Sequence, residues 1–175
     1  MKKRLILLSV IFLSIGIGCF VIIKQKGGLW SSDPIHEFSK EKRKNPYVND
    51  TLQFSLDMPE EFKMTTLEGA DDGTTTLLAQ GKDSQYQIYI MPFDEVITLT
   101  ADRIRAEIPD MVIKNDKQVK IEGSEQKALV FESADESFGP TYEAWFIHAG
   151  NLYQLKSKLD ASKLIDSALS TWKFE

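Results

Sequence analysis

Residues 141–158, TYEAWFIHAGNLYQLKSK, decide the fold of this chain. Two runs rich in apolar and aromatic residues, 141–149 and 152–158, flank the dipeptide Gly150-Asn151. Two such runs joined by two residues of this kind are typical of a β-hairpin, whose turn needs positive φ at both central positions. The stretch therefore predicts two antiparallel strands with Gly150 and Asn151 as the turn.

Upstream of this hairpin, alternation of apolar and polar residues predicts further strands. Residues 52–58 alternate most cleanly, and Pro59 follows them directly. Turn residues separate the other segments, because glycine and aspartate tolerate the left-handed conformation of tight turns. The remaining strands are predicted at residues 61–67, 74–80, 85–91, 117–121 and 126–133.

Two short helices complete the predicted elements. The first begins after Thr100, whose side chain can cap it, and ends before Pro109, which cannot continue a helix. The second is predicted at residues 161–170, with Asp160 as its N-cap. Strands, a helix, more strands and a closing helix, all with short connections, predict an α+β fold in which helices pack on a mainly antiparallel sheet.

The N-terminal segment 5–23, LILLSVIFLSIGIGCFVII, contains no charged residue and follows Lys2, Lys3 and Arg4. A helix of 19 residues rises about 28 Å, close to the ~30 Å hydrocarbon core of a bilayer. This run is longer than the core of a cleaved signal peptide, which favours an uncleaved anchor. Because cationic flanks stay in the cytoplasm, we expect a single-pass membrane protein whose C-terminal domain is extracytoplasmic.

The single cysteine, Cys19, allows a second interpretation of this segment. Ile17-Gly18-Cys19 resembles the end of a bacterial lipobox, in which the cysteine is lipidated and the preceding residues are removed. However, Gly16 stands where leucine is usual, and the apolar run continues to Ile23. These departures favour a cysteine that serves as a small apolar residue in a membrane helix, and both interpretations leave the domain tethered.

Charge divides the chain into an anchor (residues 1–26), a flexible tether (27–46) and a folded domain (47–175). The first 46 residues carry nine Lys and Arg against three acids, whereas residues 47–175 carry 12 basic and 23 acidic side chains. A domain with this acidic excess does not favour nucleic acid or anionic lipid, since both require phosphates to be neutralised. The expected contacts are therefore the membrane, through residues 5–23, and a protein in the envelope.

No pattern of catalytic, cofactor-binding or metal-binding residues is found in the sequence. The sequence has two histidines, His36 in the tether and His148 at the end of a predicted strand. Two histidines so placed do not form a zinc site or a catalytic triad of the usual kind. We therefore predict no catalytic residue, no cofactor and no metal. The alternative is a hydrolase that uses carboxylates alone, for example Glu132 with Glu143.

Carboxylates also gather between residues 132 and 143, around a glycine-containing loop. Hard cations such as calcium bind six to eight oxygens, often from such loops. The spacing matches no calcium loop, which favours a solvated acidic rim, although cation binding remains open. The acids concerned are Glu132, Asp135, Glu136 and Glu143.

Aromatic residues are the better indication of a binding surface. Tyr86 and Tyr89 are three apart and fall on opposite faces of one predicted strand, so one of them faces away from the core. Aromatics left on a wet face make interface anchors, whereas packing under the helices is the alternative. The candidate partner-binding residues are Tyr86, Tyr89, Tyr142, Trp145 and Tyr153.

Four stretches stand out in residues 47–175, which are FSLDMPEEF at 54–62, QIYIMPFDE at 87–95, the hairpin AWFIHAGNLYQLKSKL at 144–159 and ALSTWKF at 168–174. In these stretches and in the order of its elements, this part of the chain resembles the PsbP-like α/β sandwich, a group that includes bacterial envelope proteins related to DcrB. The resemblance implies an antiparallel sheet between helices, used as a non-enzymatic assembly or accessory module. Some members serve photosystems, but no such binding site is reproduced here, so no functional residue is carried over.

Overall fold

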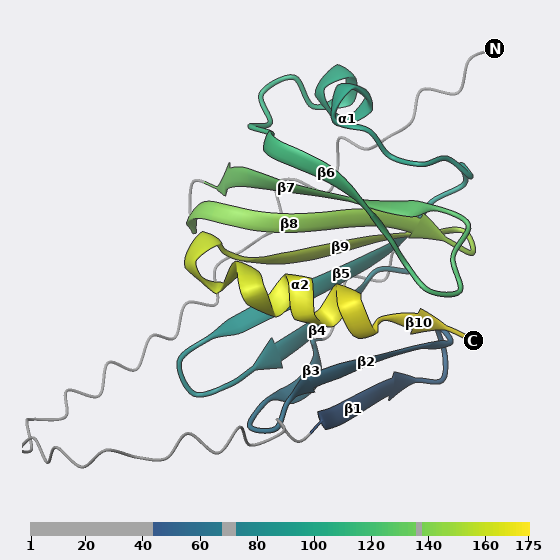
Figure 1. Cartoon of the computed structure of the whole chain (residues 1–175). Helices are drawn as coiled ribbons and strands as arrows, with labels where there is room; N and C mark the ends of the chain where they lie inside the picture. Colours follow the sequence, from purple (N-terminus) through teal and green to yellow (C-terminus); the bar gives the residue numbers. More distant parts are fainter. Residues whose placement is uncertain (1–43, 68–72, 136–137) are drawn as a thin grey trace, which may run out of the picture.

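A computed structural model describes residues 44–67, 73–135 and 138–175 of the chain (Figure 1). Two sheets and two α-helices make up this part of the molecule. The strands are β1 (Lys44–Asn49), β2 (Phe54–Pro59), β3 (Lys63–Leu67), β4 (Thr75–Gln80), β5 (Gln85–Pro92), β6 (Lys114–Lys120), β7 (Lys127–Asp135), β8 (Gly139–His148), β9 (Asn151–Lys158) and β10 (Lys173–Phe174). The helices are α1 (Ala101–Glu107) and α2 (Ser162–Thr171), with a 3₁₀ turn at Leu159–Ala161 before α2.

The larger sheet has seven strands in the order β3-β4-β5-β9-β8-β7-β6, and every neighbouring pair is antiparallel. The smaller sheet has the order β1-β2-β10 and is also antiparallel. Strands that follow one another in sequence are neighbours in most places, since short turns join them. The predicted α+β class with a mainly antiparallel sheet is confirmed.

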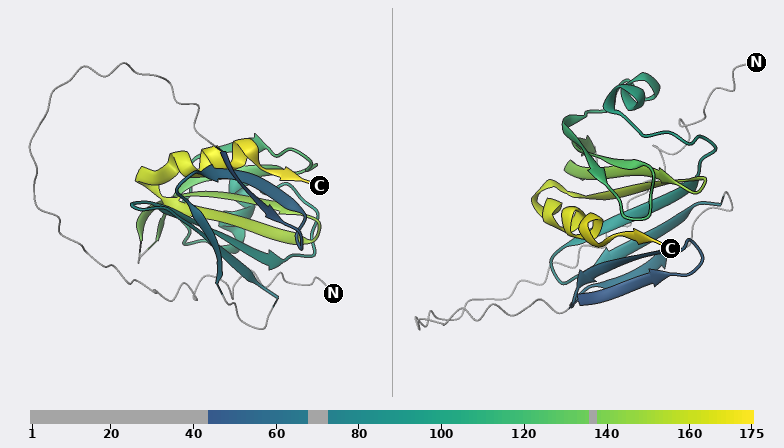
Figure 2. Two further views of the ribbon diagram at one scale, coloured as in Figure 1. Left: turned by 90° about the horizontal axis from the view of Figure 1, so that it is seen from below. Right: turned by 45° about the vertical axis from the view of Figure 1, so that its right-hand side comes forward.

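One face of the seven-stranded sheet is covered by α2 and the three-stranded sheet (Figures 1 and 2). Phe54 of β2 stacks on Trp172 with a centroid distance of 4.4 Å, and Phe146 of β8 meets the Trp172 ring edge to face at 5.3 Å. Aromatic rings are large apolar surfaces, so this cluster buries much of the area that stabilises the fold. Helix α2 therefore closes one half of a sandwich.

On its other face the sheet carries a second, smaller core beneath α1 and the loops on either side of that helix. Trp145 and Ile147 of β8 pack there with Phe131 of β7 and with Leu99 and Ile104 of the α1 region. Thr100 caps α1 as predicted, because its side chain accepts a hydrogen bond from the Arg103 N–H. Helix α1 lies on the β6 side of the sheet, so this second layer leaves the β3–β5 side uncovered by described residues (Figure 1).

The β8–β9 hairpin forms, but its turn lies one residue earlier than predicted. His148 pairs with Asn151, so the two central residues are Ala149 and Gly150, with φ of 46° and 75°. Asn151 instead begins β9, and its side chain donates to the Ala149 carbonyl at 3.2 Å. A register that opposes the apolar residues of the two strands fixes the turn position, even though it places an alanine in the left-handed region.

Two further local predictions differ from the structure. Asp160 lies in the 3₁₀ turn, and α2 begins after Ala161 without a side-chain cap. Residues 44–46, assigned by sequence to the tether, pair with β2 as the first half of β1. Strands β1 and β10 were both absent from the predicted elements.

The predicted anchor at residues 5–23, which includes Cys19, lies outside the described residues. His36 lies outside them as well. Among the residues that the structure does describe, no helix is long and apolar enough to cross a bilayer.

Candidate functional site

The five aromatic residues that the sequence indicates for partner binding have different surroundings in the structure. Four of them, Tyr86, Tyr142, Trp145 and Tyr153, are buried in the two cores. Burial raises the pKa of the Tyr153 hydroxyl to about 12 and that of Tyr86 above its usual value. Of the five, Tyr89 alone keeps a half-exposed side chain.

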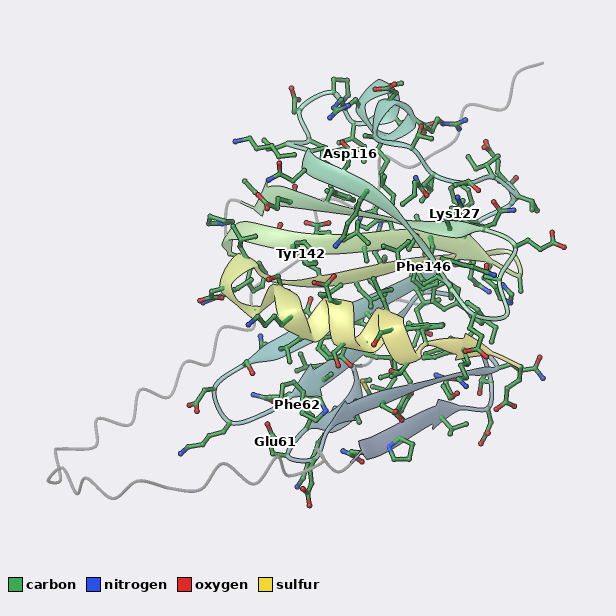
Figure 3. All side chains as sticks on the ribbon, viewed as in Figure 1. Glu61, Phe62, Asp116, Lys127, Tyr142 and Phe146 are labelled. Atoms are coloured by element: carbon green, nitrogen blue, oxygen red, sulfur yellow. The ribbon has the colours of Figure 1, made fainter. Side chains whose placement is uncertain are left out.

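Tyr142 is buried because it holds α2 against the sheet. Its hydroxyl donates a hydrogen bond to Asp166 Oδ1 of α2 at 2.9 Å, and Lys117 Nζ of β6 lies 3.6 Å from the same oxygen. Burial is the largest cause that raises the pKa of Tyr142. Figure 3 labels Tyr142 and Phe146 on β8, two residues of the face that α2 covers. The geometry assigns Tyr142 a packing role.

Glu143 is the buried carboxylate of the described residues, with 5% of its surface exposed. Its two oxygens accept hydrogen bonds from the Thr141 hydroxyl and from Trp145 Nε1, both at 2.9 Å. Lys156 Nζ of β9 lies 3.8 Å from Oε1. A buried charge needs such partners, since desolvation without them costs several kcal/mol. Glu143 thereby links three neighbouring positions of β8 and β9.

Glu132 and Glu143 face opposite sides of the sheet. Residues directly opposite each other on antiparallel strands share a face, and Glu143 is opposite Phe131 whereas Glu132 is opposite Tyr142. The two carboxylates therefore cannot act on one substrate as a pair or bind one cation. Glu136 lies outside the described residues, and no group of three metal-ligating side chains is found among those described.

His148 stacks on Phe174 of β10, with ring centroids 3.6 Å apart and an interplanar angle of 13°. Partial burial lowers the pKa of this histidine below its ordinary value. The imidazole lies where the C-terminal strand joins the β8–β9 hairpin, as a polar residue at a strand end.

The uncovered part of the sheet is the best candidate for an interaction surface. Tyr89 of β5 lies at its centre, directly between Thr76 of β4 and Gln154 of β9. The next row of the same face holds Leu78, Gln87 and the partly exposed Lys156, and Leu67 of β3 is 37% exposed at the edge. We call this the open sheet face and define it by six uncharged residues, which are Leu67, Thr76, Leu78, Gln87, Tyr89 and Gln154.

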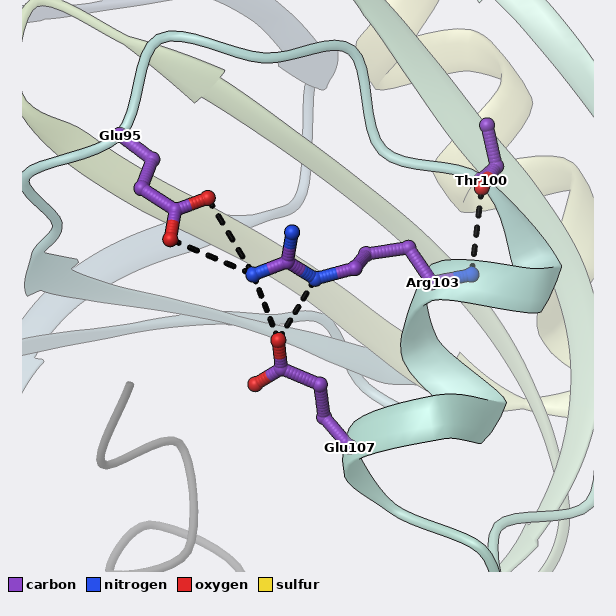
Figure 4. A network of polar contacts seen from close by, with 4 residues as sticks. All are labelled: Glu95, Thr100, Arg103 and Glu107. Atoms are coloured by element: carbon purple, nitrogen blue, oxygen red, sulfur yellow. Dashed lines mark hydrogen bonds and ion pairs between the residues drawn. The ribbon is translucent and has the colours of Figure 1, made fainter. Parts of the chain in front are cut away.

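The border between the open sheet face and the second core falls between β9 and β8. Gln154 of β9 is half-exposed, whereas its cross-strand partner Trp145 is buried beneath the loop that leads into α1. That loop is held to α1 by Arg103. Its guanidinium donates to both oxygens of Glu95 at 3.2 Å and, through Nε, to Glu107 at 2.6 Å (Figure 4).

The hydrogen bond to Glu107 is the largest cause that raises the pKa of Arg103. Because both carboxylates meet one planar guanidinium, the loop has a defined position over β8 and β9. The second layer therefore ends where this loop ends, and the open sheet face begins there.

The sequence identified Tyr89 but not the other five residues of the open sheet face. Their signal is weak, because threonine, glutamine and leucine at alternating positions also occur on any half-wet strand. Only the strand order, which places β5 between β4 and β9, brings them together.

The fold is an α+β sandwich similar to that of PsbP. Comparison with solved structures gives the solution structure of cyanobacterial PsbP (CyanoP) from Synechocystis sp. PCC 6803, with a TM-score of 0.54. The match covers 85% of this chain and 100% of that one, with 14% of residues identical. The predicted PsbP-like fold is thus confirmed, while kinship to DcrB-related envelope proteins remains a prediction.

No family model and no curated protein matches the sequence of this chain.

Proposed function

We propose that this chain is a membrane-anchored, extracytoplasmic and non-enzymatic module that binds or assembles with a protein of the cell envelope. The single observation that carries the proposal is the open sheet face around Tyr89. An antiparallel sheet commonly has one wet face, but here one half of a face is covered and the other half presents an aromatic ring whose direct cross-strand neighbours, Thr76 and Gln154, are uncharged.

The character of this face supports a protein partner. Tyrosine supplies a large contact area with little loss of side-chain entropy, and interfaces are depleted in charged residues at their centre. The domain carries a large excess of acids, so the area around Tyr89, whose direct neighbours are uncharged, is where another protein can approach with least repulsion. The predicted anchor at residues 5–23 supports a location at the membrane, with the domain outside the cytoplasm.

Site-specific photo-crosslinking in intact cells tests this proposal. A benzophenone amino acid replaces Tyr89, and in a matched variant it replaces Val96, which is 77% exposed in the loop before α1. We expect position 89 to form an adduct with a second protein, identified by mass spectrometry, and position 96 to form none. Adducts at position 96 alone, or an unmodified chain at both positions, would contradict a binding role for this face.

A further inference from the structure

We propose that two copies of this chain associate through the free edge of β3, so that two seven-stranded sheets continue into one around a two-fold axis at Thr65. This inference does not depend on the proposed function, because it concerns an edge of the sheet and a second copy of the same chain. Free strand edges present unpaired N–H and C=O groups, and natural proteins usually protect them. Among the described residues the strands at sheet edges are β1, β10, β6 and β3, and β10 already donates its Phe174 N–H to the Glu122 carbonyl.

The edge of β1 is protected by Pro46. The N–H of Asp57 donates to Thr171 Oγ1 at 2.9 Å and so points away from β1. Asp57 is opposite Pro46, and residues of such a non-hydrogen-bonded pair both direct their backbone groups outward. The proline ring therefore stands on the free edge, where a partner strand would require an N–H. At the other side of this sheet, β10 has only two residues.

The edge of β6 is protected by charge and by an irregular register. A register shift occurs between Lys114 and Lys117, and six of the seven residues of the strand are exposed. If two copies of β6 paired around a two-fold axis at Lys117, that lysine would oppose its own copy and Lys114 would oppose Lys120. Like charges directly opposite each other are destabilising, so this pairing of β6 with itself is unfavourable.

The edge of β3 has none of these protections at its centre. Its five residues, KMTTL, include neither proline nor a register shift, and four of them are exposed. The beginning of the strand also borders an open surface groove that it shares with Tyr47 of β1 and Met58 of β2. No strand of the described residues pairs with this edge, so a second strand can approach β3 there.

The backbone groups that β3 offers follow from the neighbouring hairpin. The N–H of Gly81 donates to the Ser84 carbonyl at 2.9 Å across a two-residue turn, which makes this pair hydrogen-bonded. Pairs alternate along an antiparallel ladder, so Leu78 of β4 directs its backbone groups away from β5 and toward Thr65 of β3. Met64 and Thr66 consequently direct their N–H and C=O groups to the free edge.

A two-fold axis at Thr65 matches these groups to one another. Met64 of one copy then faces Thr66 of the other and exchanges two hydrogen bonds with it, and the axis repeats the pair, which gives four hydrogen bonds. Thr65 faces its own copy, a favourable cross-strand pair, and Lys63 faces Leu67. No like charges meet, in contrast to β6.

The short contact and the charge of the domain define how the association should behave. Four backbone hydrogen bonds make a weak dimer, so it should depend on protein concentration. Each domain carries an excess of acids, and repulsion between the copies is screened as ionic strength rises, with a Debye length of about 10 Å at 0.1 M salt. We therefore expect a larger dimer fraction at 0.1 M than at about 0.01 M salt, where the Debye length is about 30 Å.

Sedimentation equilibrium of the full chain in a mild detergent tests the inference. Thr66→Pro removes an outward N–H and leaves the β3–β4 ladder intact, and Thr65→Lys places two like charges on the axis. We expect both variants to lose the dimer. Val48→Pro is the matched control, because Val48 is 52% exposed and directs its N–H to the free edge of β1 by the same alternation. That variant should keep the dimer.

A covalent readout identifies the strand involved. In a Cys19→Ser background, Thr65→Cys should form a disulfide-linked dimer under mild oxidation, whereas Val48→Cys should form at least tenfold less. A chain that remains monomeric at every concentration and salt, a dimer that survives Thr66→Pro and Thr65→Lys with unchanged affinity, or equal cross-linking at positions 48 and 65 would overturn the proposal.

Discussion

At the scale of single residues, the buried carboxylate of Glu143 has the clearest role in the stability of the fold. Replacing Glu143 by alanine removes the carboxylate that Trp145 Nε1, the Thr141 hydroxyl and Lys156 contact. Removing one partner of a buried, hydrogen-bonded pair typically costs about 3 kcal/mol. We expect Glu143→Ala to lower the free energy of unfolding by about that amount, measured by urea denaturation followed by circular dichroism.

Glu132→Ala is the matched control for this prediction. Glu132 is half-exposed on the opposite face of the same two strands, and substitutions of such residues usually change stability by less than about 0.5 kcal/mol. Equal effects of the two substitutions would contradict the assignment of Glu143 as the residue that organises its neighbours.

Ala149 holds local backbone strain in the β8–β9 turn. It has φ of 46°, and an L-residue other than asparagine or aspartate is destabilised by about 1 kcal/mol in that region. Ala149→Asn creates an Asn-Gly pair, the preferred sequence for this turn, and should stabilise the fold by up to about 1 kcal/mol. The urea midpoint measures the change. Ala134→Asn, at an exposed strand position, should instead be neutral or destabilising, since asparagine is unfavourable in strands.

At the scale of secondary-structure elements, β10 is held by the turn between β6 and β7. The N–H of Phe174 donates to the Glu122 carbonyl at 3.2 Å, and a Cβ added at Gly123 would lie 2.5 Å from the Phe174 carbonyl oxygen. Gly123 also has φ of 77°. Gly123→Ala should therefore displace β10 and destabilise the fold by about 3 kcal/mol, the sum of backbone strain and overpacking.

Gly139→Ala separates the two causes. Gly139 has φ of 74° but no heavy atom within 4 Å of an added Cβ, so this variant carries the backbone strain alone, about 1 kcal/mol. Tryptophan fluorescence gives an independent measurement, because the Trp172 ring lies 5.9 Å from the Phe174 ring of β10 and should become more exposed only in Gly123→Ala. Equal losses in both variants would show that the close approach to Phe174 does not matter.

The elements show how far the sequence could lead. Alternation predicted β2 and β5 well, because each has one buried and one half-wet face. Strand β8 has buried residues at seven consecutive positions, since both of its faces are covered, and periodicity there cannot separate core aromatics from surface ones. This is why Tyr142 and Trp145 were grouped with Tyr89. Strands β1 and β10 were not predicted, because β1 contains a proline and β10 has only two residues, which tertiary contacts hold in place.

At the scale of the whole molecule, the two covering layers are unequal, and this inequality creates the open sheet face. Helix α2 and the three-stranded sheet extend across one side of the larger sheet, whereas α1 and its loops cover only the part near β6, β7, β8 and the Leu152 end of β9. The open sheet face ends at β3, and the free edge of that strand borders the face. A partner protein on the face and a second copy at the edge would therefore occupy adjacent surfaces of the same strands.

The anchor predicted at residues 5–23 decides where these surfaces operate. We expect the full chain to sediment with membranes and to resist extraction by alkaline carbonate, because a spanning helix of this length is inserted almost irreversibly. A chain that begins at residue 27 should appear in the soluble fraction and remain folded, losing only the helical circular dichroism signal of the anchor, since the described strands and helices all lie beyond that point. Immunoblots of the fractions measure both outcomes.

Cys19→Ser distinguishes the two ways in which this segment could tether the domain. A membrane helix keeps its apolar length when one small residue replaces another, so the variant should remain with the membrane and keep its full mass. Lipidation at Cys19 would instead require the thiol, and the variant would lose a lipid adduct detectable by mass spectrometry. Protease added to intact spheroplasts should digest the domain in either case, because both interpretations tether the domain to the outer side of the membrane. Full protection of the domain would reverse the orientation and place the open sheet face and the β3 edge among cytoplasmic partners.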